Sequence, residues 1–280
     1  VSGAPSFCWS AVAGASRFVD GRPTGSARLD FIYQNDVHLA RLLDFLETTG
    51  DPRRPGRPLI ENTLVIFSSD NGSDKPDKSF TGPVRSHKGS IYEGGHRVPF
   101  IATWPLGGIG DGNSATPGRE SDRLLALTDI FATMAEILGR PLPPAQGDTY
   151  GAEDSVSQLA ALRSLACPPR IPIFANDHFE ATKELNDERA WIAVRSATAP
   201  LPGKWKLLLD HHYAWRQQIN PRELYNLADD PQEERNLIAD ARFRPALDHL
   251  IAQARLAAGD QGSTRQLQPA DHAKRPLKLP

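Results

Sequence analysis

The feature that most constrains the fold is a pair of short, almost wholly apolar runs. Residues 63–67 read Thr-Leu-Val-Ile-Phe, and residues 98–104 read Val-Pro-Phe-Ile-Ala-Thr-Trp. Continuous apolar runs rich in strand-forming residues are typical of strands that are buried on both faces of a sheet. Both runs are therefore predicted to be strands of one layered domain, and the polar stretch 70–97 between them is predicted to be a loop.

A helix is predicted before the first strand, over residues 29–47. Side chains recur there at alternating spacings of four and three, which is the period of one helix face. The stripe consists of Ile32, Asp36, Leu39, Leu43 and Leu46. Asp36 is thus expected on the apolar face, with a hydrogen-bonding partner because an unpaired buried carboxylate is costly. Gln34 is expected to face water.

A second helix is predicted after the second strand, over residues 124–138. It begins either at residue 124 or at Thr128, which can act as its cap. Gly139 and Pro141 are expected to end it. The order helix, strand, loop, strand, helix indicates an α/β domain with a mostly parallel sheet, whose ligands bind beyond the carboxyl ends of the strands.

The rest of the chain favours a small α+β subdomain with an antiparallel sheet. Short strands are predicted at residues 171–175, 191–195, 205–209 and 224–227, and a helix is predicted to start at Asp230-Pro231. Four segments follow from this pattern. They are a poorly patterned N-terminal segment (1–28), the α/β domain (29–145), the α+β subdomain (146–258) and a polar tail (259–280).

Composition excludes several classes of protein. The net charge is −2 and the pI about 6.5, which argues against a nucleic-acid binder. No stretch approaches the ~18 consecutive apolar residues of a membrane span. Two cysteines, Cys8 and Cys167, neither require a disulfide nor identify a redox compartment.

The polar corner Asp70-Asn71-Gly72 follows the first predicted strand directly. Asp70 and Asn71 offer hard oxygen ligands, which suit Ca²⁺ or Mg²⁺ better than zinc. Gly72 would let the strand break so that both side chains reach one ion. The same three residues also make an ordinary tight turn, so the corner alone leaves both interpretations open.

The next segment resembles the formylglycine-dependent sulfatases of the alkaline phosphatase superfamily. The matching stretches, in order, are NTLVIFSSDNG, HKGSIYEGGHRVPFIATWP, LTDIFATMAEILG, KWKLLLD and ELYNLADDPQEERNL. The resemblance runs over roughly residues 29–245. It implies an alkaline phosphatase-like fold and hydrolysis of aryl or carbohydrate sulfate esters through a covalent sulfo-enzyme intermediate.

The resemblance also implies roles for individual residues. Asp70 and Asn71 look like two ligands of the divalent cation, usually Ca²⁺, that holds the sulfate oxygens. Lys88 looks like the lysine that contacts the sulfate, and a fixed ammonium there would stabilise the charge that develops in the transition state. His178 is a candidate substrate contact. Glu93 and Arg97 are expected to be structural, pairing with each other or with backbone groups.

Other histidines are expected to have other roles. His87 and His96 flank the segment and are expected to serve loop structure or face solvent, with substrate contact as the alternative. His211 and His212 are expected to be a surface pair.

The family's nucleophile pattern, Cys/Ser-x-Pro-x-Arg, is not found around Cys8 or Cys167. The chain therefore resembles the C-terminal part of a sulfatase, a fragment expected to be inactive by itself. The partner class implied is a sulfated small molecule or glycan, and family inference suggests a periplasmic or secreted protein. The alternatives are a phosphatase or phosphodiesterase of the same superfamily, and a non-catalytic binding module descended from a sulfatase.

Overall fold

The computed structural model describes residues 13–74, 82–113, 116–142, 152, 154–176, 191–210 and 219–258. Their contacts divide into two compact units. The first comprises Ala102–Gly118 and the described residues up to Ile66, and the second comprises Phe67–Ile101 and the described residues from Arg119 onward. No helix in the described ranges is long and apolar enough to cross a membrane.

The first unit contains helix α1 (Ala27–Thr48), whose N-cap residue Ser26 accepts a hydrogen bond from the Leu29 amide at 3.3 Å. Two short 3₁₀ helices, η1 (Leu59–Asn62) and η2 (Pro105–Gly107), belong to the same unit. The bounds of α1 are close to the predicted range 29–47. The spacing of side chains by four and three therefore predicted the helix correctly.

The N-terminal half of α1 buries side chains outside the predicted stripe, whereas Leu46 of that stripe is 9% exposed, and Leu39 and Leu43 are half-buried. Asp36 is exposed and Ile32 is 50% exposed, whereas Asp30 and Gln34 are 6% and 7% exposed. The reason is that the segment before the helix folds back onto it. The amides of Gly14 and Ser16 donate to the Asp30 carboxylate at 2.6 and 2.9 Å, which turns that face inward. Hydrogen bonds from the Ser16 hydroxyl and then from these amides lower the pKa of Asp30.

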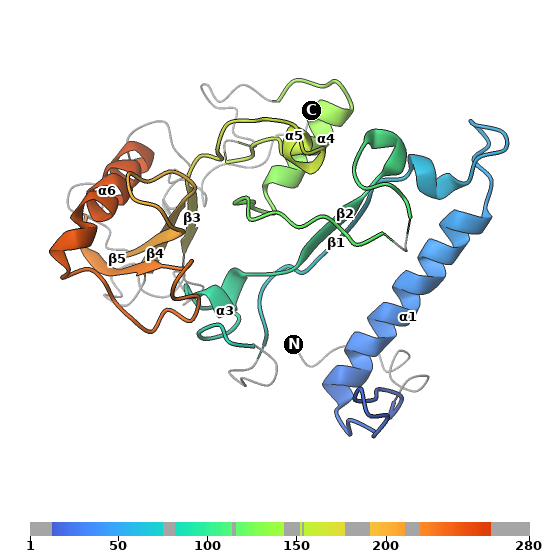
Figure 1. The fold of residues 1–280 in the computed structure, drawn as a ribbon, viewed down its shortest axis with the longest axis horizontal. Coiled ribbons are helices and arrows are strands. Elements are labelled where there is room, and N and C mark those ends of the chain that lie inside the picture. Colours follow the sequence, from blue (N-terminus) through green and yellow to red (C-terminus); the bar gives the residue numbers. More distant parts are fainter. Residues whose placement is uncertain are drawn as a thin grey trace, which may run out of the picture. The chain divides into compact units, whose positions relative to one another are not determined.

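Strands β1 (Val65–Ser68) and β2 (Phe100–Thr103) are neighbours in a two-stranded sheet, as Figure 1 shows. The two predicted strands are confirmed, but their burial on both faces is wrong for the described residues. Phe67 is 38% exposed and Ile101 is 62% exposed. Each strand has only the other as a neighbour in the described ranges, so the sheet is too narrow to enclose these side chains.

Helix α4 (Asp129–Ile137) begins at the later of the two predicted positions, after Thr128. Gly139 ends it with φ +61°, and the Arg140 amide donates to the Ala135 carbonyl at 2.8 Å, which is the closing bond of a Schellman motif. The short helix α5 (Leu159–Leu162) follows.

The C-terminal part is an antiparallel sheet of order β3-β4-β5-β6, as the sequence predicts. Its strands are β3 (Ile173–Asn176), β4 (Trp191–Ser196), β5 (Trp205–Asp210) and β6 (Pro221–Asn226). After the 3₁₀ helix η3 (Ala241–Phe243), helix α6 (Arg244–Ala258) covers one face (Figure 1). Leu207 and Leu224 join Leu250 in this core, and all three are 0% exposed.

The opposite face of this sheet packs on the polar segment that follows β1. Leu208 and Tyr225 of the sheet form one buried cluster with Ile91, which is 1% exposed, and Tyr92 packs against it. Both faces of β5 are therefore covered, which explains why residues 205–209 are apolar apart from Lys206.

The helix predicted to begin at Asp230-Pro231 does not form, and the next α-helix begins at Arg244. The capping contacts exist, because the Asp230 carboxylate accepts from the Glu234 and Arg235 amides at 3.1 and 2.9 Å. Glu233, however, has φ +57° and is 0% exposed. A left-handed backbone costs a non-glycine residue about 1–2 kcal/mol, so the buried contacts of Glu233 outweigh its helical preference.

Candidate functional site

The Asp70-Asn71 corner lies directly beyond the C-terminal end of β1. Asp70 is exposed and Asn71 is half-buried. The Ser69 hydroxyl donates to the Asn71 carbonyl at 3.0 Å, which shapes the turn. A carboxylate and an amide oxygen thus stand side by side in sequence at the strand end, as predicted.

Gly72 is needed at the corner for close approach and not for an unusual φ. A Cβ atom on Gly72 would lie 1.9 Å from the carbonyl oxygen of Gly94. The Gly72 amide donates to the Gly95 carbonyl at 2.8 Å. The corner is thereby joined to a segment more than twenty residues later in the chain.

Lys88 lies in that later segment, and its backbone is bonded to the same corner. The Lys88 amide donates to the Ser73 carbonyl at 2.7 Å, and its side chain is exposed. Two backbone hydrogen bonds, at Gly72 and at Lys88, therefore join the two predicted parts of the site.

The Glu-Gly-Gly sequence forms a single helical turn, α3 (Glu93–His96). A Cβ on Gly94 would lie 2.3 Å from the Ser86 carbonyl oxygen, and one on Gly95 would lie 1.9 Å from that of Ser90. Both glycines are required because backbone approaches backbone there. The two glycines thus let the chain fold back on itself after Tyr92.

Glu93 does not pair with Arg97, contrary to one of the predicted pairings. Its carboxylate lies 3.2 Å from the Lys206 ammonium and 3.7 Å from the Arg195 guanidinium. Lys206 also lies 2.7 Å from the Glu233 carboxylate. The Glu93–Arg97 contact is a helical backbone bond of 2.8 Å, so the i, i+4 spacing reflected α3 and not an ion pair.

Burial and charge act against each other in this cluster. Burial alone would raise the pKa of Glu93, but the charges of Lys206 and Arg195 outweigh it and hold that pKa below its usual value. Burial raises the pKa of Glu233 despite the nearby Lys206. Burial, and then the charge of Lys206, lower the pKa of His96 to about 4. His96 is thus neutral at physiological pH.

A second layer of polar contacts surrounds the cluster. Arg85 stacks 3.7 Å from the centroid of the Tyr92 ring and donates to the Tyr225 hydroxyl at 3.1 Å. Both tyrosine hydroxyls donate to Glu223, at 2.9 and 2.7 Å. Burial, and then Glu223, raise the pKa of each tyrosine. These phenols remain protonated donors and are not candidate bases.

The remaining predicted histidines are placed only in part. His178, His211 and His212 lie outside the described residues. His87, beside Lys88, is half-buried, and its Nδ1 atom has no hydrogen-bond partner in the ranges that the structure describes.

The residues present fit a hard cation only in part. Carboxylate and amide oxygens are what Ca²⁺ selects, and the close packing of Gly72 on Gly94 fixes the backbone from which they project. Among the described residues, no group of three or more His, Cys, Asp and Glu side chains could hold a metal ion. Asp70 and Asn71 by themselves offer a hard cation one carboxylate and one amide oxygen donor.

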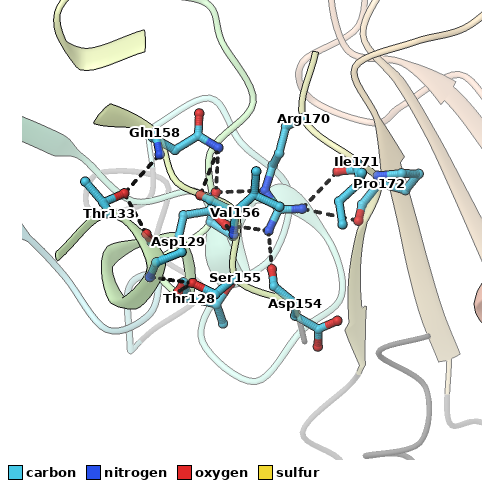
Figure 2. A network of polar contacts seen from close by, with 12 residues as sticks. Thr128, Asp129, Thr133, Asp154, Ser155, Val156, Gln158, Arg170, Ile171 and Pro172 are labelled. Atoms are coloured by element: carbon cyan, nitrogen blue, oxygen red, sulfur yellow. Dashed lines mark hydrogen bonds and ion pairs between the residues drawn. The ribbon is translucent and has the colours of Figure 1, made fainter. Parts of the chain in front are cut away.

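Asp129 and Arg170 form a separate buried ion pair, which Figure 2 shows. Arg170 donates two hydrogen bonds of 2.7 Å to the two oxygens of Asp129, and their side chains are 2% and 1% exposed. Gln158 and the amides of Ala126 and Val156 donate to the same carboxylate. Because both oxygens are engaged by protein donors, this network joins α4 to the following segments and is structural.

Comparison with known proteins shows what the chain is similar to. Residues 15–140 match the family model described as "Sulfatase", and the match includes β1, the Asp70-Asn71 corner, Lys88 and α4. This part of the chain is similar to the sulfatases. A sulfatase of Formosa agariphila is 29% identical over 237 residues, which are 84% of this chain and 39% of that protein.

Two solved structures show the same fold. A protein of Bacteroides thetaiotaomicron named as a sulfatase superposes with a TM-score of 0.59 and 18% identity over 86% of this chain and 44% of its own. A second, solved with its substrate D-glucosamine-2-N,6-O-disulfate, gives a TM-score of 0.56 and 19% identity over 83% and 41%. The fold is thus the alkaline phosphatase-like fold of the sulfatases, and the chain spans less than half the length of these relatives.

The sequence interpretation missed the residues beneath α3. Lys206 interrupts the apolar run Trp205–Leu209, and a single charge in a strand buried on both faces requires a buried partner. The sequence therefore indicates that Lys206 has a buried partner. It does not indicate that the partners are Glu93 and Glu233, because both lie far from Lys206 in the sequence.

Proposed function

We propose that the gene product containing this chain hydrolyses sulfate esters. The observation that carries the proposal is the backbone connection between the Asp70-Asn71 corner and the Lys88 segment, through the bonds of Gly72 to Gly95 and of Lys88 to Ser73. A carboxylate, an amide and an ammonium on two joined segments suit an oxyanion held by a cation and a lysine.

In this proposal Asp70 and Asn71 would hold a divalent cation, Ca²⁺ by preference for their oxygens. Such an ion, when bound, would stabilise the charge on sulfate oxygens. Lys88 would orient the sulfate and donate hydrogen bonds to its oxygens through its exposed ammonium. The formylglycine nucleophile that the family uses has no matching residue in this chain.

The substrate class we favour is a sulfated sugar, which the glucosamine disulfate bound to one structural relative supports. His178 is a candidate substrate contact, because it follows a predicted strand of the C-terminal subdomain and such subdomains often reach over the pocket. Export to the periplasm or the medium, and the division of the chain near residues 28, 145 and 258, are likewise proposals.

The test compares variants of that gene product on an aryl sulfate and on sulfated glucosamine. Asp70→Asn and Lys88→Met are each expected to lower kcat/KM by about 10²–10³-fold, the usual effect of losing one group that stabilises transition-state charge. Asp44→Asn and Lys204→Met, exposed or partly exposed residues with no proposed role, serve as matched controls and are expected to change kcat/KM less than about twofold.

Two results would contradict the proposal. Faster turnover of the matching phosphate esters would favour a phosphatase or phosphodiesterase. Absence of turnover on any sulfate ester, with Ca²⁺ present, would favour a binding module.

The expected inactivity of the purified 280-residue chain is tested separately. If that chain turns over a sulfate ester and Asp70→Asn abolishes the turnover, the chain contains a nucleophile.

A further inference from the structure

Three carboxylate and ammonium groups from distant parts of the chain meet beneath α3. Glu93 comes from the Tyr-Glu-Gly-Gly stretch, Lys206 from strand β5 and Glu233 from the Asp-Pro-Gln-Glu stretch. The Lys206 ammonium lies 3.2 Å from Glu93 and 2.7 Å from Glu233. The side chains of Lys206 and Glu233 are 0% exposed, and that of Glu93 is 8% exposed.

Stability alone does not explain this cluster. Taking charges out of water costs energy that the ion pair regains only with good geometry, and well-packed apolar residues often do as well or better. Glu233 additionally keeps a left-handed backbone, with φ +57°. A buried, strained and charged arrangement is better explained by the need to fix one geometry.

Glu233 holds α3 from two sides. Its carboxylate accepts a hydrogen bond of 2.6 Å from the Glu93 amide, the first amide of α3. Its carbonyl accepts one of 2.9 Å from the Arg85 guanidinium, and the Arg85 carbonyl in turn accepts from the Gly94 amide at 2.8 Å. Lys206 neutralises the carboxylates on which this arrangement depends.

The held turn is the one that contacts the corner. Gly95, two residues after Glu93, accepts the hydrogen bond from the Gly72 amide, and Gly94 fills the space that a Gly72 side chain would occupy. A shift of α3 would therefore move the backbone that follows Asp70 and Asn71.

We propose that Lys206 is a positioning residue for the Asp70-Asn71 corner. Its buried ammonium fixes α3 between Glu93 and Glu233, and α3 fixes the backbone of Gly72. The inference rests on the proposed function for what the corner holds, but the mechanical connection can be tested without metal or substrate.

The test is amide hydrogen exchange at single-residue resolution on the 280-residue chain carrying Lys206→Met. The Gly72 amide is expected to exchange at least about tenfold faster than in the unmodified chain, as in a local opening. The amides of β4 and of the α6 helix should change much less. Lys204→Met is the matched control, since Lys204 lies on the same segment but pairs at the surface with Asp122. It should leave Gly72 unchanged.

A purely stabilising role predicts a different pattern. If Lys206 only supported the sheet, Lys206→Met would accelerate exchange across β4 and α6 as much as at Gly72, and the proposal would be wrong. Unchanged exchange at Gly72 would overturn it equally.

Two further variants keep the test decisive if Lys206→Met does not fold. Glu93→Gln retains the shape of the side chain and removes its charge, and it is expected to accelerate Gly72 exchange in the same direction. The double variant Lys206→Met with Glu233→Gln removes one charge of each sign and is expected to restore part of the protection at Gly72. Failure of both effects would contradict the proposal, whatever the outcome of the sulfatase assay.

Discussion

At the scale of single residues, the site depends on glycines that permit contact between backbones. Gly72→Ala would place a methyl group 1.9 Å from the Gly94 carbonyl oxygen, and a backbone atom cannot rotate away. We expect a loss of about 1–3 kcal/mol in the free energy of unfolding, as for other overpacked sites. Urea denaturation measures this, and Gly50→Ala is the control because no atom lies within 4 Å of its added carbon. Equal stability of the two variants would contradict the packing described.

The buried Asp129–Arg170 pair gives a second prediction at this scale. Arg170→Met leaves the Asp129 carboxylate uncompensated at 1% exposure, so we expect a loss of about 3–5 kcal/mol. Arg242→Met is the matched control, because it breaks a solvent-screened surface pair with Asp240, which should contribute little to stability. Urea denaturation measures the free energy of unfolding of both variants. Similar losses in the two variants would show that burial does not determine how much each ion pair contributes.

At the scale of elements, α3 is held by a cluster that also contains a neutral histidine. The pKa of His96 is about 4 in the folded chain against an ordinary value of 6.5. Between pH 4 and 6.5 the unfolded chain therefore binds a proton at His96 that the folded chain does not bind. The free energy of unfolding is thus highest above pH 6.5 and falls as the pH drops toward 4. The effect is up to about 3 kcal/mol. Denaturation between pH 4 and 7 should show a shallower slope for His96→Gln, and an unchanged slope would contradict the assignment.

At the scale of the whole molecule, burial is concentrated in the C-terminal sheet. Val194, Leu207 and Leu208 are 0% exposed, whereas α1 exposes Tyr33 and Phe45 by 43% and 56%. Elements with few buried apolar contacts open most easily. Amide exchange is thus expected to be slowest in β4 and β5 and faster in α1 by about 10²-fold or more. Equal protection in the two regions would show that they unfold together.

The sequence by itself determined the local elements and the similarity to the sulfatases. The apolar runs before Asp70 and before Trp104 predicted β1 and β2, and the order of short motifs led to the sulfatase family that residues 15–140 match. These features depend on neighbours in the chain, so periodicity and turn chemistry suffice to find them.

Only the tertiary structure decided which charges are buried together. Glu93 finds Lys206 at a separation of 113 residues, and its amide finds Glu233 at 140. The same distant contacts prevented a helix at Glu233, and a folded-back segment placed Asp30 and not Asp36 on the inner face of α1. Local patterns cannot predict such choices, because the free energy that selects them comes from burial against partners that the local sequence does not name.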